Sequence, residues 1–136
     1  MLRVNNTLKM TKEKFHIEYI FDKVSQKSLW NHLTTPPGLS AWFAEEVMIN
    51  GNIYTFKWNR TTEEAELVSM KPGITVRYRW VEEDDARAYF EFIIHPIELT
   101  GATALEITDF AEPDDKADSI NLWDSQIEAL KRTLGI

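Results

Sequence analysis

The sequence predicts an α+β domain in which an antiparallel sheet is covered by a C-terminal amphipathic helix. Residues 46 to 110 alternate apolar and polar side chains between turn signals, which indicates consecutive strands. Residues 114 to 135 repeat apolar side chains at helical spacing. With 43% hydrophobic and 12% aromatic residues in 136, the chain is typical of a globular protein with a bulky core. We expect one domain over residues 12–136, after a disordered N-terminal arm at residues 1–11.

The first part of the chain predicts one strand and two short helices. Residues 15–21 are β-rich and favour a strand. Residues 25–33 favour a helix with Ser25 as its N-cap. Pro36-Pro37 should end that helix and open a second turn, because the residue before a proline avoids the helical region. The apolar side chains on these helices are Leu29, Trp30, Leu33, Leu39, Trp42 and Phe43.

Turn residues predict the register of the strands that follow. Asn50-Gly51 favours a two-residue type I′ hairpin, which sets Ile49 opposite Asn52 and Val47 opposite Tyr54. A Pro72-Gly73 turn predicts the pairs Ala65–Trp80, Leu67–Tyr78 and Ser69–Val76. A loop of Asp84, Asp85 and Ala86 predicts the pairs Trp80–Phe90 and Tyr78–Phe92.

This register separates an aromatic inner face from a charged outer face. Leu105 and Ile107 of the last strand extend the inner face. On the outer face Arg79 is expected between Glu66 and Glu91. The helix stripe that should pack on the inner face contains Ile120, Trp123, Ile127, Leu130 and Leu134. Gly135 is placed to end that helix.

Composition and spacing exclude several function classes. The chain has no cysteine, and its net charge of −7 without a basic cluster disfavours nucleic acid as a partner. No segment is apolar enough to span a membrane, so we expect a cytoplasmic protein. His16, His32 and His95 lack the spacing of metal ligands, and we expect no cofactor. Glu91 and Glu106 are expected to be solvated on the outer face, so the sequence favours a non-catalytic protein.

Three segments resemble a known family. The segment "VSQKSLWNHLTTPPGLSAWFAEE" has the Trp-containing helix and the proline kink of the START-like (SRPBCC) superfamily. It is most similar to the branch of homologues of the activator of the heat-shock protein 90 ATPase. "TGATALEITDF" and "INLWDSQIEALKRTLG" resemble that branch's late strand and closing helix. The resemblance implies a helix-grip fold: a curved antiparallel sheet wrapped around the long C-terminal helix, with two short helices after the first strand. One departure is Trp42-Phe43, where a Trp pair is usual.

The resemblance implies a domain that binds a small hydrophobic ligand between the sheet and the C-terminal helix. Trp42 and Phe43 would lie at the mouth of the pocket, and Tyr hydroxyls and Trp N–H groups would orient the ligand. The same aromatic rings can instead fill the core, which would leave a chaperone-associated or other protein-interaction domain. The pocket candidates are Trp30, Trp42, Phe43, Tyr54, Phe56, Trp58, Tyr78, Trp80, Phe90, Phe92, Trp123 and Ile127.

Apolar residues on the outer face of the sheet provide a further alternative. If they are contiguous they form a surface for a protein partner or for a weak homodimer. If they are scattered they are ordinary surface residues. This set contains Met48, Ile53, Val68, Met70, Val81, Tyr89 and Ile93.

Overall fold

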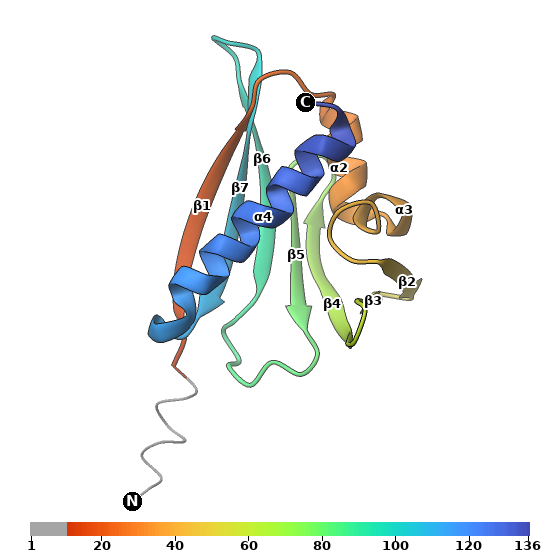
Figure 1. Cartoon of the computed structure of the whole chain (residues 1–136), viewed down its shortest axis with the longest axis vertical. Helices are drawn as coiled ribbons and strands as arrows, with labels where there is room; N and C mark the ends of the chain where they lie inside the picture. Colours follow the sequence, from red (N-terminus) through yellow and green to blue (C-terminus); the bar gives the residue numbers. More distant parts are fainter. Residues whose placement is uncertain (1–10) are drawn as a thin grey trace, which may run out of the picture.

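The computed structural model describes residues 11–136 and shows one seven-stranded antiparallel sheet with a long helix across one face (Figure 1). The strand order is β1-β7-β6-β5-β4-β3-β2. The predicted α+β helix-grip fold is confirmed, and the arm expected at residues 1–11 falls outside the described residues except at Thr11. The elements are β1 (Glu13–Phe21), α2 (Gln26–Thr34), α3 (Pro36–Leu39), β2 (Glu46–Asn50), β3 (Ile53–Lys57), β4 (Thr62–Lys71), β5 (Thr75–Trp80), β6 (Phe90–Ile97), β7 (Ala102–Ala111), the 3₁₀ helix η1 (Pro113–Asp115) and α4 (Lys116–Leu134).

The Pro36-Pro37 pair separates α2 from α3, as predicted. Ser25 is the N-cap of α2, and Thr35 after the helix is extended, with φ −104° and ψ 151°. The Thr35 hydroxyl accepts a hydrogen bond from the Gly38 N–H at 3.0 Å and so caps α3. A Cβ at position 38 would collide with the backbone of Asn31, so only glycine permits this close contact between the helices. The two helices therefore form a tightly packed elbow.

The β2–β3 hairpin keeps the predicted faces, but its turn lies one residue later than predicted, so the predicted pairing is wrong by two residues. Ile49 pairs with Tyr54, which leaves Gly51 and Asn52 as the turn. A type I′ turn at Asn50-Gly51 would require a positive φ at Asn50. Within residues 11–136 only glycines have positive φ, and Gly51 has φ 65°. The positive φ at the first central residue alone is the pattern of a type II′ turn.

The β4–β5 pair contains a β-bulge that the sequence analysis did not predict. The pairs Ala65–Trp80 and Leu67–Tyr78 are confirmed. The predicted Ser69–Val76 pair is wrong, because an irregularity between Leu67 and Ser69 sets Met70 opposite Val76. The turn accordingly has three residues, 72–74, between the paired Lys71 and Thr75.

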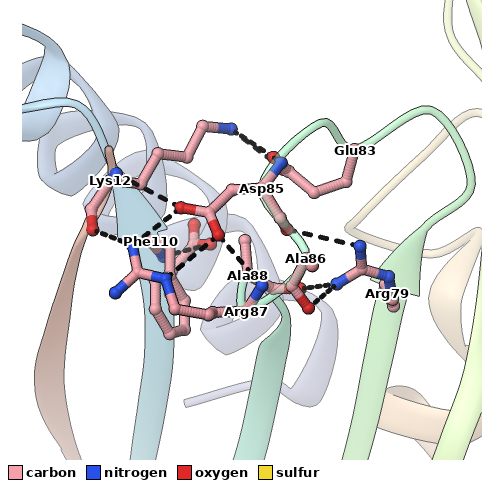
Figure 2. Close-up of polar contacts among 9 residues, drawn as sticks. Lys12, Arg79, Glu83, Asp85, Ala86, Arg87, Ala88 and Phe110 are labelled. Carbon is pink, nitrogen blue, oxygen red and sulfur yellow. Dashed lines mark hydrogen bonds and ion pairs between the residues drawn. The ribbon is translucent and has the colours of Figure 1, made fainter. Parts of the chain in front are cut away.

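The predicted β5–β6 register is wrong by two residues. Tyr78 pairs with Phe90, and Arg77 pairs with Glu91, so residues 81–89 form a longer connection than the predicted three-residue loop. Arg79 therefore lies beyond the ladder, and the predicted Glu66–Arg79–Glu91 arrangement is wrong at Glu91. The Arg79 guanidinium instead donates hydrogen bonds to three carbonyl oxygens of the connection, those of Asp85, Ala86 and Ala88 (Figure 2).

Figure 2 also shows that the β5–β6 connection is tied to the segment before β1. The Asp85 carboxylate accepts hydrogen bonds from the Arg87 guanidinium at 2.8 Å and from the Lys12 backbone N–H at 3.3 Å. The Lys12 ammonium contacts the Glu83 carboxylate at 2.9 Å. Hydrogen bonds from Arg87 hold the pKa of Asp85 well below its usual range. These contacts fix the connection, and with it the adjoining ends of β5 and β6.

Glu91 is covered by its neighbours, so the expectation that it is solvated is wrong. It is only 9% exposed and accepts a hydrogen bond from the Arg77 guanidinium at 3.0 Å. That guanidinium lies 3.8 Å from the ring centre of Tyr89, a cation–π contact that shields the pair. Glu106 is partly exposed and lies between His16, at 3.2 Å, and His95, at 2.9 Å.

The core lies between α4 and the inner face of the sheet (Figure 1). Leu105 and Ile107 of β7 are fully buried, as predicted. In the α4 stripe Trp123, Ile127 and Leu130 are buried, while the remaining two members are partly buried. Gly135 adopts φ 78° and ends the helix, as predicted.

Candidate functional site

A cavity of about 440 Å³ lies between the N-terminal half of α4 and the inner face of the sheet. It is partly open to solvent. The sheet side is formed at the start of β4, the end of β5, the start of β6 and the end of β7. The lining residues are Phe43, Trp58, Thr61, Glu63, Trp80, Phe90, Asp109, Ser119, Leu122, Trp123 and Gln126.

The side chains of β4 differ in their relation to the cavity. Because alternate residues of a strand share a face, β4 presents Glu63, Ala65 and Leu67 on the same face. Ala65 is fully buried between Tyr54 of β3 and Trp80 of β5 and is not part of the cavity lining. Glu63 is exposed and lines the cavity.

Five aromatic rings form a continuous wall of the cavity. Their centroids are 5.9 Å apart for Phe43–Trp58, 6.4 Å for Trp58–Trp80 and 5.0 Å for Trp80–Phe90. The circuit closes through Phe90–Trp123 at 6.4 Å and Trp123–Phe43 at 6.0 Å. Such spacings are typical of aromatic pairs in contact. We call these five residues the aromatic wall.

Asp109 is the half-buried acidic group of the cavity. Its Oδ2 accepts a hydrogen bond from the Trp123 indole N–H at 2.9 Å, and its Oδ1 accepts one from the Phe110 backbone N–H at 2.7 Å. Burial raises the pKa of Asp109, and the hydrogen bond from Trp123 offsets part of this effect. A carboxylate in this setting is an acceptor for a polar group on a bound molecule.

The indole N–H groups of the wall differ in their partners. Trp58 donates to the Phe43 carbonyl at 2.9 Å, and Trp123 donates to Asp109. No residue in the described range 11–136 accepts a hydrogen bond from the Trp80 indole N–H, and Trp80 is only half-buried. Trp80 therefore offers the cavity a donor that the protein does not use.

Three other aromatic donors complete the C-terminus of α2. The Trp42 indole donates to the His32 carbonyl at 2.7 Å, the Tyr78 hydroxyl to Leu33 at 2.9 Å and the Tyr54 hydroxyl to Thr34 at 2.8 Å. In a continuous helix the first two carbonyls would accept from residues 36 and 37, but both are prolines and have no N–H. These hydroxyls and this indole therefore bond to the protein backbone, not to the space where the sequence analysis expected them to orient a ligand.

The structure places five of the twelve predicted pocket residues at the cavity and seven elsewhere. The aromatic wall, Phe43, Trp58, Trp80, Phe90 and Trp123, lines the cavity. Trp42 is 7% exposed and borders a shallower depression of about 430 Å³, which shares Phe43 and Trp58 with the cavity. Trp30 is half-buried on α2, outside the cavity lining. The other five, Tyr54, Phe56, Tyr78, Phe92 and Ile127, are buried in the core and do not line the cavity.

The sequence analysis missed the polar residues of the site. Asp109 had a signal: it continues the alternation of Leu105 and Ile107, so the parity that placed those residues inward places this carboxylate inward too. Ser119, Leu122 and Gln126 lie beside the predicted stripe of α4 and had no such signal. The described residues contain no group of three or more His, Cys, Asp or Glu arranged to hold a metal ion.

The comparisons with known proteins identify the class to which this fold and cavity belong. The chain belongs to the START-like superfamily, because the model of the START-like superfamily domain matches residues 9–136. The protein BfR322 from Bacteroides fragilis, solved by NMR in solution, is 40% identical with a TM-score of 0.66. The match covers 90% of this chain and 90% of that chain. No curated protein matches the sequence significantly.

More distant solved structures share the fold alone. Aha1 from Colwellia psychrerythraea, solved as a dimer in solution, has a TM-score of 0.77 at 19% identity, and the match covers 91% of this chain and 97% of that chain. DynU16, from the dynemicin biosynthetic locus, has a TM-score of 0.74 at 15% identity. That match covers 92% of this chain and 48% of the other. In the part of this chain that the structure describes, no helix has the length and apolar character needed to cross a membrane.

Proposed function

We propose that the protein binds a small hydrophobic ligand, without catalysing a reaction, in the cavity between the sheet and α4. The observation that carries the proposal is the cavity of about 440 Å³ bounded by the aromatic wall. Its volume lies within the range of small-molecule pockets, roughly 300–1,000 Å³. Its polar groups include the Asp109 carboxylate and the Trp80 indole N–H, which are suited to orient a ligand. Membership of the START-like superfamily supports the same function.

Calorimetric titration with a hydrophobic probe tests this proposal. Binding should have a negative heat-capacity change, the mark of apolar burial. Trp80→Ala should weaken binding by about 1–3 kcal/mol, the scale for a buried aromatic contact. Trp30→Ala is the matched control, because Trp30 is also half-buried but lies outside the cavity lining. Absence of binding to the wild type, or equal losses in the two variants, would contradict the proposal.

The outer face of the sheet supports a second candidate function, self-association. Three of the predicted apolar residues there are strongly exposed: Met48 at 45%, Val68 at 49% and Val81 at 51%. The placement of Met70 on this face is wrong, because the β-bulge sets it opposite the buried Val76 of the inner face. Exposed apolar side chains favour burial against a partner when they are contiguous. Analytical ultracentrifugation of the wild type and of Val68→Lys tests this function. A wild-type dimer that the substitution dissociates would support it, and a monomer at all concentrations would exclude it.

A further inference from the structure

The charges around the cavity are of one sign. Among the lining residues Glu63 and Asp109 carry carboxylates, and none is Lys, Arg or His. The protein as a whole has a net charge of −7. A negatively charged ligand group would therefore meet two carboxylates without a balancing cation. The cavity is better suited to a ligand with a positive charge.

The Asp109 carboxylate is not neutralised by the protein. Its hydrogen-bond donors, Trp123 and the Phe110 backbone, are both uncharged. The ammonium of Lys12 acts on it only through space and is bonded to Glu83, whose carboxylate adds repulsion. Because a half-buried carboxylate without a cationic partner is partly desolvated and unpaired, a cation delivered by a ligand would lower its free energy.

The aromatic wall has the chemistry that complements such a charge. The faces of Trp and Phe rings attract cations through their quadrupoles, most strongly for Trp. Three of the five wall residues are Trp, namely Trp58, Trp80 and Trp123. Trp123 also donates to Asp109, so ring and carboxylate are adjacent. A cation at the wall would therefore contact rings and a carboxylate together.

We propose that the ligand of this cavity is an organic cation, an apolar body that carries a quaternary or protonated amine. The cationic group lies against the aromatic wall beside Asp109, and the apolar body fills the space toward Leu122 and Phe43. Glu63 at the exposed rim adds a longer-range attraction. This inference rests on the proposed function, because it assigns the class of ligand for the same cavity.

Three probes with a shared phenyl group and different head groups test the inference: phenyltrimethylammonium, its uncharged carbon isostere tert-butylbenzene, and benzenesulfonate. Binding is followed by the NMR shifts of the Trp80 and Trp123 indole N–H groups. The cation should bind about tenfold or more tightly than the isostere, because only the cation gains both a cation–π contact and the attraction of the Asp109 carboxylate. The sulfonate should bind more weakly than either.

Two variants locate the effect. Asp109→Asn should remove most of the preference for the cation and leave the affinity for tert-butylbenzene within about twofold. Glu63 is exposed, so the Glu63→Gln variant should retain its fold. This variant should bind the cation a few-fold more weakly than the wild type. Glu106→Gln, on the opposite face, is the matched control and should change neither affinity. If Asp109→Asn does not fold, the three probes on the wild type and the effect of Glu63→Gln still decide whether the cavity prefers a cation.

The outcomes separate the two proposals. If tert-butylbenzene binds as tightly as phenyltrimethylammonium, the ligand class is wrong while the hydrophobic pocket remains. If cation binding is unchanged by both Asp109→Asn and Glu63→Gln, the assigned position of the charge is wrong. If none of the probes binds and no indole shift changes, the proposed function itself fails.

Discussion

The two ends of the protein interior are built from the same kinds of side chain but differ in structure. At the closed end Trp42, Tyr54 and Tyr78 donate to successive carbonyls of α2, are buried, and lie outside the lining of the cavity. At the open end Trp58, Trp80 and Trp123 border about 440 Å³ of space. At the closed end Trp42 and Tyr78 supply donors to two carbonyls whose partners in a continuous helix would be prolines.

The double proline is the origin of this difference. It removes two backbone N–H groups at the end of α2, and the carbonyls that lose them belong to the half-buried His32 and the buried Leu33. A buried carbonyl without a donor costs about 1–3 kcal/mol, so side-chain donors are favoured there. Beside the cavity, no carbonyl of the described residues accepts a hydrogen bond from the Trp80 indole N–H, so no such bond holds Trp80 in the core. The following substitutions compare the two ends directly.

The largest expected effect is at Trp42, at the closed end. Trp42→Ala removes a 7% exposed ring that contacts Phe92 at 6.0 Å and a hydrogen bond to His32, so unfolding free energy should fall by about 3–5 kcal/mol. Trp80→Ala at the half-exposed open end should cost only about 1–2 kcal/mol. Urea denaturation measures both. Equal losses would remove the distinction between the two ends.

The next effect isolates one hydrogen bond at the closed end. Tyr78→Phe removes the hydroxyl that bonds to the Leu33 carbonyl and leaves that carbonyl without a donor, which should cost about 1–3 kcal/mol. Tyr19→Phe is the matched control, because its hydroxyl bonds to Asp124 at 2.6 Å on the exposed surface. Water can replace that bond, so the control should cost less than about 1 kcal/mol. A smaller loss for Tyr78→Phe than for Tyr19→Phe would contradict the role of the proline pair.

Much of the fold follows from the sequence because local patterns determine it. The alternation of residues 46 to 110, the helical stripe with Trp123 and the break at Pro36-Pro37 are properties of short segments, and the structure confirms all three. The β5–β6 register was not predictable in this way. It depends on Arg79, whose three bonds to loop carbonyls form only in the folded loop.

The candidate site was predictable only in part. Alternation identifies which aromatic rings face inward, but not which of them remain beside open space. That division depends on where the carbonyls of α2 lie relative to Tyr54 and Tyr78, which is a tertiary property. Asp109 was accessible to reasoning from alternation and was overlooked.

A pH-dependent effect distinguishes the open end. Burial raises the pKa of Asp109 above its unfolded value of about 3.9, so its deprotonation disfavours the folded state. Its contribution to stability is fully present below the unfolded pKa and is lost as pH rises through the folded pKa. Relative to Asp109→Asn, the wild type should therefore lose stability as pH rises above about 4.

Denaturation of both proteins at a series of pH values measures this difference, in which all other titrating groups cancel. The amide has one oxygen for two donors, so it leaves either Trp123 or Phe110 without an acceptor, but that offset does not change with pH. Tyr78→Phe, at the closed end, should show no such slope. A difference in unfolding free energy between the wild type and Asp109→Asn that stays constant over this pH range would show that folding does not raise the pKa of Asp109.

The smallest expected effect on stability is at Arg79, which holds the loop beside the open end. Arg79→Ala should cost only about 1 kcal/mol, because its carbonyl acceptors at residues 85, 86 and 88 can turn to water. It should nevertheless weaken probe binding, since this loop positions Trp80 and Phe90, and leave the closed end unaffected.

Glu66 faces Arg79 across the strands but bonds to Asn52 at 3.2 Å. A double-mutant cycle of Arg79→Ala with Glu66→Ala should therefore be additive within about 0.5 kcal/mol. A coupling energy well above that value would support the ion pair between Glu66 and Arg79 that the sequence predicted. Unchanged probe affinity in Arg79→Ala would show that the open end keeps its shape without the loop.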